Sequence, residues 1–383
     1  MDATLLQQKD RLTSFVLLLP LGFLLLGTAI RFLAFRYQLP NEPFTRYFDE
    51  LCRWDCHWYV LMAENGYHQF PTPNRTNAGN WAFFPLYPML VGAIAKLIPL
   101  PTVVVGSLVS LCVAYAATVL AWPLLGRDRK AYALYAAFIL SGPVSFYFTT
   151  FFTEVMFVLL TTMVFRTLNN KNYLAASGFA ALLSATRIVG VFIAISIGTQ
   201  ALVDYRQTHG TWRGVVPGLL RQHNLVLAIF IAPLGLFVYM AFLHYWVGDG
   251  LAFSHVQRAW GRQFDNPAVY LWRGLTNFPS DGFRLSPSQI LALSACAGLA
   301  LTGVLVWRRQ WAAAVFALLA IIVPLMAGLA SMLRFMTGMA PLTITLMTLL
   351  ARYRWLFALS MLVMLVGAWF TTLAWLGGNI ALV

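Results

Sequence analysis

Long apolar runs alternate along the chain with two polar segments, residues 36 to 81 and 248 to 287. The first apolar run extends from residue 12 to residue 30, shortly after Lys9 and Arg11. At about 1.5 Å per residue, a helix of this length spans roughly the 30 Å hydrocarbon core of a bilayer. We therefore expect the first membrane span here. Further apolar runs lie at residues 102–125, 131–150, 152–168, 173–203, 224–247, 288–307, 311–330, 334–351 and 354–376.

Two apolar runs do not fit a single ordinary span. Residues 83–100 contain three prolines and a lysine, and if they crossed the membrane the basic cluster at 127–130 would lie outside. Because short cytoplasmic loops carry an excess of Lys and Arg, we place residues 83–100 in the interface or as a re-entrant segment. The 31 residues of 173–203 are too long for one span and carry Arg187 at their centre. They are predicted to form a pair of short helices that return to the same side.

The composition indicates an integral membrane protein. Apolar residues make up 60% of the 383 residues and charged residues 10%, whereas an ordinary soluble domain is about 25% charged. These values exclude a soluble enzyme, a disordered chain and a disulfide-rich secreted domain. The net charge of +13 is typical of basic cytoplasmic loops, so no nucleic-acid partner is expected. We predict an all-α polytopic protein, a single transmembrane domain over residues 1–383 with about eleven membrane segments, its N-terminus inside and its C-terminus outside.

The charge pattern places both polar segments on the outer side of the membrane. The first outer loop is predicted over residues 36–100, with interfacial or re-entrant helices, and the second over residues 248–287. Eight of the 13 acidic residues fall in these two segments, whereas Lys and Arg dominate the connections predicted on the cytoplasmic side. Any chemistry is therefore expected to face outward.

One acidic residue of the first loop is a candidate general base. Asp55 lies in the sequence FDELCRWDCHWYVLMAENGY, residues 48–67, whose spacing of aromatic residues favours a helix at the bilayer surface. A carboxylate at the water boundary of a helical bundle can accept a proton from a sugar hydroxyl, provided that it stays ionised. The alternative is a solvated acid on an interfacial helix.

Cys52, Cys56 and His57 stand close together and superficially suggest a metal site. No second Cys or His cluster stands at ligand spacing, so no metal is expected. A disulfide between the two cysteines would have to fit across one helical turn, near the edge of its geometric range. The sequence also lacks P-loop, GxGxxG, HExxH and GxSxG motifs, and no cofactor is predicted.

Five further charged residues are candidates for function. Glu154, Arg187 and Arg334 lie within or at the ends of apolar runs, where a charge costs about 2.5–3.5 kcal/mol on insertion scales. Their alternative role is a buried ion pair that holds helices together. Arg258 and Arg262 are four apart in the second loop, and on one helix face they would hold a phosphate. The alternative for this pair is contact with anionic lipid headgroups.

At these residues the chain resembles the PIG-V mannosyltransferase family, polytopic enzymes of the GT-C fold superfamily that use lipid-phosphate sugar donors. The combination WD-x-x-x-Y-x-x-x-A-x-x-GY followed by AFFPLYP is the most specific part of the resemblance. The matching blocks are RWDCHWYVLMAENGY (53–67), AFFPLYPML (82–90), FYFTTFFTEVMFVLL (146–160), ATRIVGVF (185–192), GDGLAFSHVQRAWGR (248–262) and SMLRFMTGMAPL (331–342).

The resemblance implies roles for individual residues. It places the catalytic Asp of the first outer loop at Asp55, with Asp49 as the alternative base because other GT-C families carry an Asp-Glu pair in this loop. Its TE, TR and S-x-x-R blocks fall on Glu154, Arg187 and Arg334, and Arg334 with Arg258 or Arg262 is the expected donor phosphate site. Substrate-binding or structural roles are expected for Arg53, His57, Tyr59, Glu64, Tyr67, Trp81, Glu154, Arg187 and Trp260.

The implied activity is an inverting transfer of a hexose, with mannose expected, from a polyprenyl-phosphate sugar donor to a lipid-linked or membrane-proximal acceptor hydroxyl. The chain departs from the eukaryotic pattern at Cys56-His57-Trp58, so acceptor recognition does not carry over. The expected location is a bacterial inner membrane with the site facing the periplasm, or the endoplasmic reticulum lumen in a eukaryote. The rival hypothesis is a transporter or lipid flippase with Glu154 and Arg187 as its intramembrane site.

Overall fold

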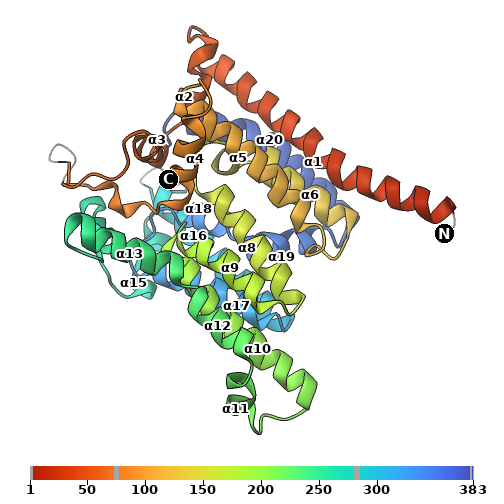
Figure 1. The fold of residues 1–383 in the computed structure, drawn as a ribbon. Coiled ribbons are helices and arrows are strands. Elements are labelled where there is room, and N and C mark those ends of the chain that lie inside the picture. Colours follow the sequence, from red (N-terminus) through yellow and green to blue (C-terminus); the bar gives the residue numbers. More distant parts are fainter. Residues whose placement is uncertain (1–2, 73–76, 280–284, 380–381, 383) are drawn as a thin grey trace.

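The computed structural model describes residues 3–72, 77–279, 285–379 and 382, and the regular elements of this part of the chain are all helices, with no β-strand (Figure 1). The α-helices of the first half are α1 (Ala3–Gln38), α2 (Tyr47–Leu51), α3 (Asp55–Asn65), α4 (Leu86–Ala95), α5 (Thr102–Ala121), α6 (Arg129–Ser141), α7 (Phe146–Thr149), α8 (Glu154–Asn169), α9 (Tyr173–Ser184) and α10 (Ile193–His209).

The second half continues in the same way, and short 3-10 helices join several of the longer elements. Its α-helices are α11 (Val215–Leu220), α12 (His223–Ile231), α13 (Leu234–Val247), α14 (Ala252–His255), α15 (Pro267–Thr276), α16 (Pro287–Trp307), α17 (Trp311–Leu325), α18 (Met332–Thr337), α19 (Ala340–Leu350) and α20 (Arg354–Leu376). The 3-10 helices are η1 (Phe44–Arg46), η3 (Asn80–Ala82), η4 (Ile188–Phe192) and η5 (Val256–Trp260).

Six helical segments of the described chain are long and apolar enough to cross a membrane, which confirms a polytopic helical membrane protein. Four shorter apolar helices, α4, α9, α17 and α19, accompany them. The total of about eleven membrane segments stays a prediction. The six segments are Leu12–Gln38, Thr102–Ala121, Ile188–His209, His223–Val247, Pro287–Trp307 and Arg354–Leu376.

The two ambiguous apolar runs have different outcomes. The run at 83–100 forms α4, whose 10 residues reach about 15 Å, half of a hydrocarbon core. This length fits the interfacial or re-entrant segment that the charge pattern favours. The run at 173–203 divides at Arg187, whose backbone is extended between α9 and η4. The first helix of the predicted pair, α9, is short. The second part is not, because η4 and α10 together form a 22-residue segment that is long enough to cross the membrane.

The N-terminal helix is held against the bundle by close backbone contact. α1 packs along α6 and α20, beside which it runs in Figure 1. At Gly27 a Cβ atom would lie 2.0 Å from the carbonyl oxygen of Leu140 in α6. Only glycine permits this approach, as in other helix pairs of membrane proteins that pack through small residues.

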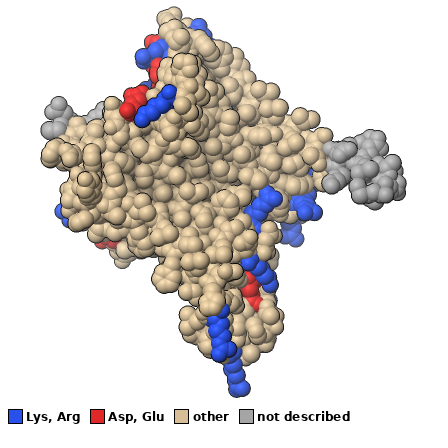
Figure 2. All heavy atoms as spheres, in the orientation of Figure 1, with Lys and Arg blue, Asp and Glu red and all other residues tan. Residues whose placement is uncertain are grey.

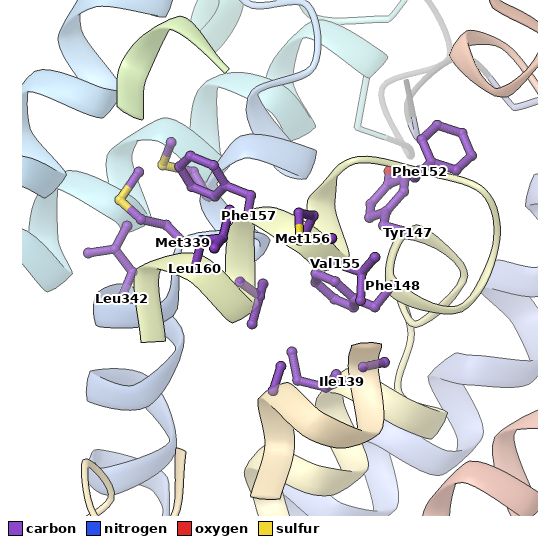
Figure 3. Packing of buried hydrophobic residues seen from close by; sticks show 14 of the residues in the cluster. Ile139, Tyr147, Phe148, Phe152, Val155, Met156, Phe157, Leu160, Met339 and Leu342 are labelled. Carbon is purple, nitrogen blue, oxygen red and sulfur yellow. The ribbon is translucent and has the colours of Figure 1, made fainter. Parts of the chain in front are cut away.

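A dense aromatic core surrounds the start of α8. Phe146, Tyr147, Phe148, Phe151 and Phe152 are all fully buried. Figure 3 shows side chains of this segment turned toward α6, with the side chains of the rest of α8 beside those of the α19 region. Close-packed interiors have low compressibility. The packing of these rings therefore holds Glu154, the first residue of α8, at a defined position in the bundle.

Charged side chains are sparse on the surface. On the face seen in Figure 2, acidic and basic residues gather at the end near α2, and basic residues gather toward the opposite end, near α11. A wide uncharged band separates the two groups. This distribution is typical of a protein whose middle zone contacts lipid.

Candidate functional site

A cavity of about 790 Å³ lies where the two polar segments meet the helical bundle. Asp55 of α3 and Arg334 of α18 form its polar end together with Arg187, and residues of η5 and the following loop close another side. Its apolar wall includes side chains of η4 and α17. One end of the cavity is therefore charged and another is suited to hydrocarbon.

Asp55 and Arg334 form the central ion pair of this cavity. Asp55 is the first residue of α3, and its Oδ2 accepts a hydrogen bond of 2.6 Å from Nη2 of Arg334 in α18. Arg334 is buried, whereas the side chain of Asp55 keeps 22% of its surface exposed to the cavity. Both residues were predicted, and they lie 279 positions apart in the sequence.

Behind this pair lies Glu154, fully buried at the start of α8. Its Oε1 accepts a 2.9 Å hydrogen bond from Nη2 of Arg187 and lies 2.8 Å from Nε of Arg334. The Arg334 Nε contact lacks hydrogen-bond geometry, so it is an electrostatic contact. We call Asp55, Arg334, Glu154 and Arg187 the paired cluster. Two carboxylates and two guanidiniums alternate in it, so its formal charges cancel.

The guanidinium of Arg187 also lies over two aromatic rings. Its central carbon is 4.5 Å from the ring centre of Phe335 and 5.5 Å from that of Phe157. Such cation–π contacts offset part of the cost of removing the charge from water. The structure thus contains the buried Glu-Arg pair that the sequence suggested as the structural role of these residues.

Arg258 and Arg262 bring charge from the second polar segment to the cavity. They do not share a helix face, because η5 ends at Trp260 and Gly261 turns the chain with a φ of 67°. The prediction of a common helix face was therefore wrong, although both guanidiniums reach the same cavity. Burial lowers the pKa of Arg262, but arginine stays protonated at neutral pH.

Neither of these two arginines forms a salt bridge in the part of the chain that the structure describes, and Arg262 senses the charge of Asp55 only at longer range. Arg262 makes one long hydrogen bond, 3.4 Å, from its Nη2 to Oγ of Ser331. Arg258 is exposed at the cavity wall. Guanidiniums that face a cavity and form no salt bridge are available to an anionic ligand.

Aromatic residues form a further wall. The hydroxyl of Tyr59 is 3.1 Å from Oγ1 of Thr153, immediately before Glu154. Trp260 meets the rings of Trp58 and Phe83 edge to face, at 5.9 Å in each case. The second polar segment is thereby packed onto the first through aromatic rings.

His255 is a residue of the cavity wall that the sequence reasoning missed. Its Nδ1 lies 2.7 Å from Oδ2 of Asp249, and this hydrogen bond lowers the pKa of Asp249. The sequence signal was available, since both residues belong to the block GDGLAFSHVQRAWGR.

Several predicted residues lie outside the cavity. Arg53 is bound to Glu50 and to the carbonyl oxygen of Leu376. Tyr67 donates to the carbonyl oxygen of Phe83, and Trp81 donates to that of His68, so both support the loop that carries Phe83. The remaining members of this group, Asp49, His57 and Glu64, are exposed on α2 and α3.

The cysteine pair has a different geometry from the one expected. Cys52 follows α2 and Cys56 lies in the first turn of α3, and the two are joined in a disulfide with a Cα–Cα distance of 5.2 Å. The bond therefore links two helices across a turn and does not bridge one helical turn. Among the described residues, no three His, Cys, Asp or Glu side chains come together as a possible metal site.

Comparisons with protein-family profiles, curated proteins and solved structures found no match for this chain. Its function therefore has to be inferred from the residues that line the cavity. These residues offer one partly exposed carboxylate, four guanidiniums and an extended apolar wall.

Proposed function

We propose that this protein is a membrane glycosyltransferase of GT-C type that moves a hexose, with mannose expected, from a polyprenyl-phosphate donor to a lipid-linked or membrane-proximal hydroxyl. The observation that carries the proposal is the meeting of Asp55 with Arg258, Arg262 and Arg334 in one cavity that also has an apolar wall. A carboxylate, a cationic phosphate site and a hydrocarbon-compatible surface are the three requirements of this reaction. The motif resemblance supports the same conclusion.

The donor phosphate is assigned to the arginines of the second polar segment, with Arg334 assisting. Arg258 and Arg262 form no salt bridge among the described residues, whereas Arg334 already contacts Asp55 and Glu154. A guanidinium can bind two phosphate oxygens through parallel N–H donors. The leaving polyprenyl monophosphate would be stabilised by the same groups.

The polyprenyl chain is assigned to the apolar wall of the cavity. Ile188 and Val189 of η4 face this space together with Ala320, Val323 and Pro324 of α17. These side chains offer no hydrogen bonds to compete with the phosphate site. Burial of a hydrocarbon chain against them is favourable by about 25 cal/mol per Å² of apolar surface removed from water.

Asp55 is assigned the role of general base. As the acceptor oxygen attacks C1 of the hexose, Asp55 takes the hydroxyl proton, and the C1–O bond to phosphate breaks with its electron pair passing to the phosphate. A single displacement of this kind inverts the configuration at C1. The 2.6 Å hydrogen bond from Arg334 orients the carboxylate at the charged end of the cavity.

The disulfide supports an outward-facing site. Disulfides persist in oxidising compartments such as the bacterial periplasm and the endoplasmic reticulum lumen. The Cys52–Cys56 bond lies in the same loop as Asp55, so it favours the orientation inferred from the charge pattern. A bacterial inner membrane with the site facing the periplasm remains our proposal for its location.

Replacement of the base tests the function. In purified protein, Asp55→Asn should lower the transfer of hexose from a polyprenyl-phosphate hexose by about 10²- to 10⁴-fold, because an amide cannot accept the proton. Glu64→Asn is the matched control, since Glu64 is exposed on the same helix outside the cavity. If Asp55→Asn transfers hexose at a near-native rate and Asp49→Asn does not, the general base is Asp49. If both variants transfer hexose at a near-native rate, the proposal is wrong.

A transporter remains the second candidate because of one observation. Oε2 of Glu154 is buried without a hydrogen bond among the described residues, and unsatisfied acids inside a membrane often mark a transport path. Reconstituted protein that moves a labelled lipid between leaflets, with no sugar transfer from any polyprenyl-phosphate hexose, would favour this candidate.

A further inference from the structure

The turn that leads into Asp55 has an unusual backbone. Trp54 has a φ of 55° and a ψ of −117°, close to the first central position of a type II′ turn at about 60° and −120°. The N–H of Cys56 donates a 3.1 Å hydrogen bond to the carbonyl oxygen of Arg53, closing the turn between residues i and i+3. Asp55 is thus the second central residue of this turn.

Trp54 occupies a position that normally requires glycine. A side chain at these angles is strained, and such strain persists only where the surrounding structure holds it in place. Strained residues of this kind cluster at functional sites. Some contact must therefore prevent Trp54 from relaxing to ordinary backbone angles, which would move Asp55 with it.

The Cys52–Cys56 disulfide encloses this turn. Cys52 precedes the turn, Cys56 is its last residue, and both are buried. The backbone beside Cys52 is anchored in turn, because Nε1 of Trp375 in α20 donates a 3.0 Å hydrogen bond to the carbonyl oxygen of Leu51. The turn cannot open while both ends are bonded to each other and one end is held by the core.

We infer that the Cys52–Cys56 disulfide is a covalent clamp that keeps the strained Trp54–Asp55 turn closed and so holds the Asp55 carboxylate in the cavity. This inference rests on the proposed role of Asp55. The two cysteines are positioning residues, since they touch neither cavity nor substrate and act through Asp55. The carboxylate lies 2.6 Å from Arg334 in the clamped state.

The clamp predicts a selective loss. Without the disulfide, relaxation of Trp54 displaces the carboxylate from the attacking hydroxyl, and a misplacement of about 1 Å costs up to roughly 10²-fold in rate. The donor phosphate is assigned to Arg258 and Arg262, with Arg334 assisting, and all three lie outside the turn. The rate constant kcat should therefore fall while KM for the donor stays close to that of the wild type.

The test measures kcat in variants of Trp54 that relieve the backbone strain and in variants that only remove the tryptophan ring. Purified Cys52→Ser/Cys56→Ser protein is assayed alone and combined with Trp54→Gly or Trp54→Ala. Both changes at Trp54 remove the ring, but only glycine adopts its backbone angles without strain. We expect Trp54→Gly to recover kcat several-fold over Trp54→Ala in the protein without the disulfide, and the two to differ little when the disulfide is intact.

Two outcomes overturn the clamp: wild-type kcat in the serine pair, or equal kcat for glycine and alanine at position 54 in that background. Should the serine pair fail to fold, the glycine and alanine variants are compared in disulfide-intact protein after partial reduction. Alanine should then lose more activity than glycine, and equal losses overturn the clamp. If Asp55→Asn is inactive and the protein with both serines is fully active, only the clamp hypothesis is wrong. If Asp55→Asn is active, the proposed function itself is wrong.

Discussion

The two polar segments present their charges to the cavity in different ways. The first holds Asp55 by the disulfide, by the turn at Trp54 and by an ion pair with Arg334. The second presents Arg258 and Arg262 without salt bridges among the described residues, on a short 3-10 helix and the loop after it. A rigid carboxylate beside adaptable guanidiniums suits a reaction whose base needs exact alignment and whose bulky lipid donor has to enter and leave.

The largest expected effect comes from removing Glu154 of α8, which lies behind the Asp55–Arg334 ion pair of the rigid side. Glu154→Ala leaves the guanidiniums of Arg187 and Arg334 without their shared buried acid, and such a loss costs about 3–5 kcal/mol. Chemical unfolding in detergent micelles should show this cost as a large decrease in the free energy of unfolding of Glu154→Ala. Glu64→Ala, an exposed acid on α3, is the control and should change stability by no more than about 0.5 kcal/mol. Equal free energies of unfolding for Glu154→Ala and Glu64→Ala would contradict a structural role for the buried ion pairs of Glu154.

A smaller effect is expected on the adaptable side. Arg262→Lys keeps the charge but loses the planar fork of donors, so KM for the donor should rise about tenfold while stability stays near wild type. The constant kcat should also fall, because the leaving phosphate is stabilised by the same donors. Steady-state kinetics with a polyprenyl-phosphate hexose measures both constants. Arg273→Lys in α15, outside the cavity, serves as the control. An unchanged donor KM in Arg262→Lys would favour contact with lipid headgroups instead.

The smallest effect concerns Asp249 and His255 in the second segment. The hydrogen bond from His255 lowers the pKa of Asp249 below its ordinary value of 3.8. An acid with a lowered pKa in the folded state stabilises the protein above its ordinary pKa, and this contribution is lost as the pH falls through the folded value. Thermal unfolding should show Asp249→Asn slightly less stable than wild type at pH 5, with the difference vanishing in strong acid. Because both side chains are largely exposed, a large difference would mean that this segment is more rigid than described.

The individual charged residues of the site were easier to predict than their partners. Glu154, Arg187 and Arg334 stand out in the sequence because a charge within an apolar run has to be compensated. The helix shared by Arg258 and Arg262 was a wrong prediction, since the sequence pattern does not reveal that Gly261 adopts a positive φ. The geometry of the cysteine bridge was likewise missed because a helix was expected to continue through the turn at Trp54.

The sequence by itself determined that the protein is a helical membrane protein and which charged residues are costly to bury. Apolar runs and their lengths are local properties, and the bilayer thickness converts them directly into helices. The tertiary structure alone decided that Asp55 meets Arg334 across 279 positions, and that both meet Arg262 in one cavity. Such contacts depend on the rotation and packing of whole helices against one another, which no local pattern specifies.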